Sequence, residues 1–89
     1  MEMIGGLFKS ATLYKLLRVL VLSEKSFHLR ELAREVGCSA IFVKKELESL
    51  ERIGLVLNSR VGNRSYWEVN RASPFFHEFR ALFRKAHSA

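Results

Sequence analysis

Leucine and valine mark the first regular segment of the chain. They recur three, four, seven and eight positions apart over residues 13–21, which is the apolar stripe of an amphipathic helix. Ser10 is placed to cap this helix with its hydroxyl group, and the stripe ends near Leu22. We therefore expect a first helix that begins at Ser10, preceded by a lead-in segment over residues 1–9.

The middle of the chain predicts two helices joined by a sharp turn. Residues 27–29 suit a short extended piece, and residues 30–36 supply two helical turns that stop at Gly37, because glycine adopts left-handed backbone at little cost. Ser39 is a suitable N-cap for the next helix, which Gly54 ends. The inward positions of this third helix are three and four residues apart: Val43, Leu47 and Leu50.

Beyond the third helix the period of the pattern changes from helical to two. Residues 55–57 begin a strand, Gly62-Asn63 is typical of a hairpin turn, and residues 65–69 form the returning strand. Alternation along this strand directs Trp67 toward the core and Tyr66 toward the outer face. The pattern therefore predicts a β-hairpin with a basic tip.

A last helix is predicted over residues 74–86. Ser73 suits its N-cap and Pro74 its first position, where the missing N–H is not needed. Its apolar face is predicted to hold Phe75, Phe79, Leu82, Phe83 and Ala86. The segments together predict an α+β fold in one domain over residues 10–89, with a three-helix core, a two-stranded hairpin and a C-terminal helix.

The composition indicates a polyanionic partner and a second subunit. Hydrophobic residues make up 48% of the 89 residues, including seven Phe, which is more than so small a core encloses, so part of it is expected between subunits. Fifteen Lys and Arg against nine acidic residues give a net charge of +6, which favours nucleic acid or an anionic membrane. The longest apolar run, residues 19–22, is far below the ~20 residues that span a bilayer. No leader peptide is recognisable, so we expect a soluble, cytoplasmic protein without a membrane partner.

Several catalytic and metal chemistries are not expected. All nine acidic residues are Glu, so Asp-based magnesium sites and Ser-His-Asp triads are excluded. Cys38 is the only cysteine and is interpreted as an inert core thiol, and Gly5-Gly6 lacks the residues of a phosphate-binding loop. His77 and His87 point roughly 280° apart around a helix, at 100° per residue, so only two subunits together would bring them to one ion. We expect no cofactor, no metal and no enzymatic activity.

The central segment, LRELAREVGCSAIFVKKELESLERIGLV, resembles winged helix-turn-helix transcriptional regulators of the ArsR-like type. Ala33 and Gly37 stand at the small-residue positions of the motif, and Val43 and Leu47 on the inward face of the recognition helix. The resemblance covers roughly residues 7–86. It implies a β-wing, matched by LVLNSRVGNRSYWEVN, and a terminal helix used in dimer formation, and it implies regulation of transcription by binding double-stranded DNA.

Candidate DNA-binding residues lie on three segments. If the recognition helix, about residues 40–53, turns Val43, Leu47 and Leu50 inward, its outward positions can face a major groove. Lys44 and Lys45 can contact phosphate groups or the base edge of guanine. The alternative is that they only keep this face of the helix hydrated. The full candidate set on this helix is Ala40, Ile41, Phe42, Lys44, Lys45 and Glu48.

Arginines on the wing and on the second helix complete the predicted DNA surface. Arg60, Asn63 and Arg64 lie at the wing tip over residues 60–64, where a minor groove concentrates negative potential. Arg30 and Arg34 are candidate phosphate contacts, with an ion pair to Glu31 as the alternative for Arg34.

Two apolar positions keep a second class of function open. Ile41 and Phe42 suit an apolar anchor for a protein-interaction winged helix without a specific DNA target. Their structural alternative is that Ile41 packs under the wing and Phe42 folds back on the edge of the domain.

A homodimer is predicted through the last and first helices. The stripe on the last helix is too apolar to stay exposed on so small a domain. The predicted interface residues are Leu13, Leu17, Phe75, Phe79, Leu82 and Phe83. The alternative is a monomer with a tightly docked C-terminal helix, and the sequence does not indicate a small-molecule effector.

Overall fold

The computed structural model describes residues 11–23 and 25–88, and it confirms the α+β fold. The predicted lead-in segment and the Ser10 cap lie outside the described residues. The elements in chain order are α2 (Ala11–Ser23), β1 (Phe27–His28), α3 (Leu29–Val36), α4 (Ala40–Arg52), β2 (Val56–Val61), β3 (Arg64–Val69) and α5 (Phe76–Ser88).

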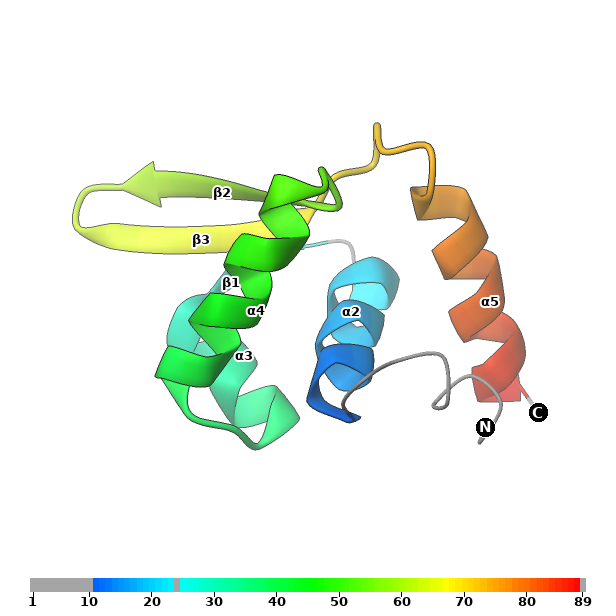
Figure 1. The fold of residues 1–89 in the computed structure, drawn as a ribbon, viewed down its shortest axis with the longest axis horizontal. Helices are drawn as coiled ribbons and strands as arrows, with labels where there is room; N and C mark the ends of the chain where they lie inside the picture. The colour runs from blue at the N-terminus through cyan, green and yellow to red at the C-terminus, as the bar shows by residue number, and fades with distance from the viewer. Residues whose placement is uncertain (1–10, 24, 89) are drawn as a thin grey trace.

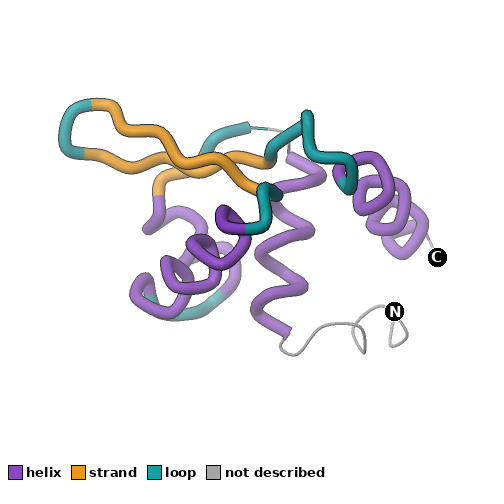
Figure 2. Tube along the Cα trace, turned by 45° about the horizontal axis from the view of Figure 1, so that its top comes forward, coloured by secondary structure: helices purple, strands orange, loops and turns teal. Residues whose placement is uncertain are grey.

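The three strands form one antiparallel sheet in the order β1-β3-β2. The hairpin of β2 and β3 extends beyond the helical body at one end of the molecule, and α5 lies beside α2 at the other end (Figure 1). Figure 2 shows the short strand β1 beside this hairpin, where it pairs with the middle of β3. The arrangement therefore leaves the outer half of the hairpin free of helices.

Helix α3 begins one residue earlier than the sequence predicts, because His28 caps it. The Nδ1 atom of His28 accepts a hydrogen bond from the Arg30 amide (3.3 Å), and Oε1 of Glu31 accepts one from the His28 amide (2.9 Å). This reciprocal pair is a capping box in which histidine replaces the usual serine or threonine. At the other end Gly37 takes left-handed backbone (φ 73°), as predicted, and its amide donates to the Ala33 carbonyl.

Helix α4 has the predicted cap and the predicted inward face. The Phe42 amide donates a hydrogen bond to the Ser39 hydroxyl (3.2 Å), and the helix ends at Arg52, before Gly54 at φ 80°. Its buried residues are Val43, Leu47 and Leu50. The remaining sides of α4 are therefore available to solvent.

The core lies between α2, α3, α4, α5 and the inner face of the sheet. Trp67 is buried as predicted, and Phe27 pairs with it from β1. The most completely buried side chains are Phe76, Phe83, Leu16, Leu17, Leu20, Leu32, Leu47, Val21, Val43 and Val56. Within the described ranges, the structure holds no helix that combines the length and the apolar character needed to cross a membrane.

The last helix differs from its prediction in where it starts and in one residue of its inward face. Helix α5 begins at Phe76, because the Ser73 hydroxyl and carbonyl accept the amides of Phe75 (3.2 Å) and Phe76 (3.1 Å) and hold the chain in a turn. Phe76 is therefore buried with 2% of its surface exposed, whereas Phe75 is 53% exposed. The prediction that Phe75 belongs to the apolar face of the helix is wrong, because the turn at Ser73 places Phe75 before the first residue of α5, where it is exposed.

Phe83 ties α5 to α2. Its ring meets the ring of Tyr14 edge-on, with centroids 5.6 Å apart, and stacks on Phe79 with centroids 5.9 Å apart. No part of the Phe83 side chain is exposed. Helix α5 is therefore part of the subunit's own core.

Candidate nucleic-acid interface

The outward side of α4 is the centre of the candidate interface. Lys44, Lys45 and Glu48 are exposed, and Ile41 is 85% exposed at the beginning of the helix. The alternative in which Ile41 packs under the wing is therefore wrong. Ala40 is half-buried against the core, so it presents little surface to a ligand.

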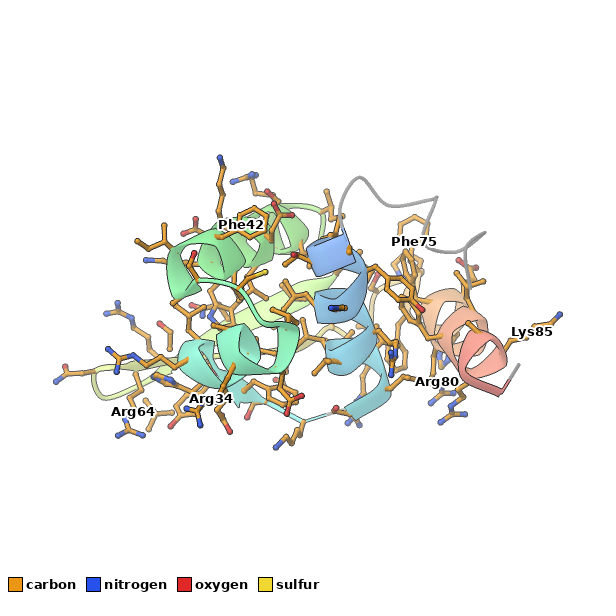
Figure 3. All side chains as sticks on the ribbon, turned by 90° about the horizontal axis from the view of Figure 1, so that it is seen from below. Arg34, Phe42, Arg64, Phe75, Arg80 and Lys85 are labelled. Atoms are coloured by element: carbon orange, nitrogen blue, oxygen red, sulfur yellow. The ribbon has the colours of Figure 1, made fainter. Side chains whose placement is uncertain are left out.

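Phe42 lies apart from two of the candidate arginines, Arg34 of α3 and Arg64 of the wing (Figure 3). Its side chain is 38% exposed, so it is not folded into the core. Figure 3 shows it on the side of α4 that is far from Arg34 and Arg64. A ligand that touches those two arginines therefore approaches a different side of the domain from Phe42.

The wing presents different side chains on its two faces. Residues paired across antiparallel strands point to the same face, and neighbours along a strand alternate. Arg60 pairs with Ser65, which shares its face with the buried Trp67, whereas Arg64 pairs with Val61 on the opposite face. The two wing arginines therefore project from opposite faces of the hairpin, a feature that their positions beside one turn did not reveal.

A shallow depression lies between α3 and the wing. Its lining residues are His28, Arg30, Glu31, Arg34, Arg64 and Tyr66. The rings of His28 and Tyr66 meet edge-on, with centroids 5.9 Å apart, and these residues pair across β1 and β3. Figure 3 shows the side chains of Arg34 and Arg64 projecting from the same side of the molecule. The fold thus brings the arginines of α3 and one wing arginine together.

The net charge is not concentrated on the two helices of the motif. Helix α3 carries two arginines and two glutamates, and α4 carries three basic and three acidic residues, so each helix is formally neutral. The wing carries two arginines and one glutamate. Attraction of a polyanion to this side therefore depends on how individual cations are placed rather than on a uniform positive surface.

The surroundings of Cys38 and of the possible metal ligands bear on two further expectations from the sequence. Cys38 is half-buried, with its thiol 3.0 Å from the Thr12 hydroxyl, so it lies at the edge of the core and not inside it. Across the described part of the chain, no group of three or more His, Cys or Glu side chains comes together as a metal site.

The predicted dimer residues fall into two groups. Leu17 and Phe83 are buried in the subunit's own core, with 1% and 0% of their surfaces exposed, so their assignment to an interface is corrected. Leu13, Phe79 and Leu82 are half-buried and Phe75 is exposed. These four residues retain surface that a partner can cover.

Comparison with solved structures identifies the fold. The crystal structure of Rv0081 from Mycobacterium tuberculosis matches with a TM-score of 0.70 and 24% identity, over 98% of this chain and 84% of that one. The solution structure of Mb0332 from Mycobacterium bovis, a homodimeric winged helix-turn-helix DNA-binding domain and possible ArsR-family regulator, matches with a TM-score of 0.69 and 20% identity, over 96% of this chain and 75% of that one.

A third similar structure is the regulator PcaV from Streptomyces coelicolor in complex with its natural ligand. Its TM-score is 0.69 with 19% identity, and the match covers 90% of this chain but only 58% of that one. No family model and no curated protein sequence matches the chain. The chain therefore has the winged helix-turn-helix fold, and its structural neighbours are winged helix transcriptional regulators.

Proposed function

We propose that the protein is a sequence-specific, double-stranded DNA-binding regulator of transcription that works without catalysis. The observation that carries this proposal is the placement of an exposed α4, with Lys44 and Lys45 on its outward side, next to a hairpin that extends beyond the helical body (Figure 1). Such a helix enters the major groove of B-DNA, and the hairpin flanks it.

Each element then has a distinct task on the duplex. Lys44 and Lys45 contact base edges or nearby phosphates, while Ile41 contacts a thymine methyl group. The wing, with Arg60, Asn63 and Arg64 at its tip, lies at the adjacent minor groove. The arginines of α3 contact the phosphate backbone and fix the register of the domain on DNA.

The variant Lys44→Ala/Lys45→Ala tests the assignment of α4. We expect the variant to bind a duplex that was selected for binding to the wild-type protein about 10-fold or more weakly. The variant should also lose its preference for this selected duplex over a scrambled one, because contacts with base edges distinguish one sequence from another. Arg30→Ala is the matched control, and it should weaken binding to both duplexes by a similar factor. Binding isotherms measure both effects. An unchanged affinity in the double variant would contradict the assignment of α4 as the recognition helix.

A protein-interaction module is the second candidate. The 85% exposure of Ile41, together with the partly exposed Phe42, favours an apolar anchor for a protein partner. In that case duplex DNA would not bind at low salt. The positive charge would then serve only solubility.

We also propose a homodimer through α5 and α2; the similar Mb0332 domain is described as homodimeric. The surface left for it consists of Phe75, Phe79, Leu82 and Leu13. Two-fold pairing would set two recognition helices about 34 Å apart, one turn of DNA or a multiple of it, and would imply a palindromic site.

Phe75→Glu tests this dimer. Since Phe75 is largely exposed, the variant should stay folded, sediment as a monomer and bind DNA much more weakly, because only one half-site is held at a time. Sedimentation of the wild type at tens of micromolar is the direct comparison. A wild-type protein that is already monomeric at that concentration would refute the dimer.

A further inference from the structure

The two arginines of the wing tip have different neighbours. Arg60 lies on the face of the hairpin that continues into Trp67 and the helical core, as its pairing with Ser65 requires. Arg64 lies on the other face and lines the depression together with Arg30 and Arg34 of α3. Arg34 and Arg64, which are 30 positions apart in the chain, thus line the same depression.

The chemistry of this depression suits a phosphate group. Three of the residues that line it are arginines, and a guanidinium group forms paired hydrogen bonds with phosphate oxygens in a planar geometry. The one carboxylate in the lining, Glu31, accepts the His28 amide at 2.9 Å and so serves as part of the helix cap. His28 and Tyr66, in edge-to-face contact, join α3 to the wing beside these arginines.

We propose that this depression is a cradle for one phosphodiester group of the DNA backbone, held jointly by Arg64 of the wing and by Arg30 and Arg34 of α3. The inference rests on the proposed DNA-binding function and assigns Arg64 a positioning role in it. Arg60 and Asn63 are left as the wing residues that respond to the sequence-dependent width of the minor groove. A phosphate contact fixes the angle between wing and recognition helix but carries no sequence information.

The test compares Arg64→Gln with Arg60→Gln. Both changes remove one positive charge from an exposed position at the same wing tip, so net charge and fold are matched. Arg64→Gln should weaken selected and scrambled duplexes by the same factor, about 10-fold, and lower the slope of log affinity against log salt by roughly 0.9. Arg60→Gln should instead change the ratio between duplexes with A·T-rich and G·C-rich flanks.

A double-mutant cycle with Arg34→Gln tests whether the cradle is shared. If Arg34 and Arg64 hold the same phosphate, the loss in the double variant should be at least about threefold smaller than the product of the single losses. The losses for Arg34 and Arg60 should multiply to within about twofold. Equal coupling in both cycles, or a change of sequence preference in Arg64→Gln, would overturn the cradle.

Titration with inorganic phosphate separates this inference from the proposed function. Wild-type protein that binds no duplex at low salt would refute the DNA-binding function itself. If such a protein still bound inorganic phosphate, and Arg64→Gln abolished that binding, the depression would be a site for a free anion and the duplex cradle would be overturned. The cradle is supported if the protein binds duplex DNA with the expected coupling between Arg34 and Arg64. Inorganic phosphate should then compete with the duplex only at concentrations at which other salts also weaken binding.

Discussion

Phe83→Glu is expected to leave the domain unfolded at 25 °C. The side chain is fully buried between α5 and α2, with its ring against those of Tyr14 and Phe79. Removal of a core Phe side chain alone costs about 3–5 kcal/mol, and a carboxylate in its place adds the cost of an unpaired buried charge. A domain of this size has a total stability of roughly 5–10 kcal/mol.

Circular dichroism and the fluorescence of Trp67, the only tryptophan, follow this unfolding directly. Phe75→Glu is the matched control, because it adds the same charge immediately before α5, at a position that is 53% exposed. The control should remain folded at 25 °C. A Phe83→Glu variant that melted cooperatively near the wild-type temperature would show that Phe83 lies outside the core and would restore it as an interface residue.

The local signals of the helix-turn-helix were readable from the sequence. Gly37 and Ser39 occupy positions where backbone conformation and capping allow few residue types, so the turn and the start of α4 follow from chemistry within a few residues. The hairpin was equally local, since the turn at Gly62 and the alternation around Trp67 define it. The His28 cap escaped prediction because histidine seldom serves as an N-cap.

Tertiary packing determined what the sequence did not reveal. Ser73 and Pro74 resemble a helix start, yet hydrogen bonds to Ser73 form a turn and shift the start of α5 to Phe76. This shift exchanges Phe75 for Phe76 on the inner face, and docking of α5 on α2 buries Phe83. The sequence of an amphipathic helix does not show whether its apolar face packs against the same subunit or against another one.

The candidate site also combines features that the local sequence predicts with features that depend on the three-dimensional arrangement. Exposure of Lys44 and Lys45 followed from the helical period of α4. The separation of Arg60 from Arg64 required the strand register, and the convergence of Arg64 with Arg34 required the placement of α3 beside β3. The second of these relations joins residues that are distant in the chain.

Duplex affinity as a function of salt tests the central proposal most directly. A dimer that neutralises roughly six to ten phosphates should lose about 10³- to 10⁵-fold in affinity between 50 and 200 mM salt, because each contact releases condensed counterions. The candidate cations for these contacts are Arg30, Arg34, Lys44, Lys45, Arg60 and Arg64. A fluorescence-anisotropy titration of labelled duplex with wild-type protein measures this slope, and we expect a steep decline. A flat response over that range, or no duplex binding at low salt, would contradict DNA binding and favour the protein-interaction module.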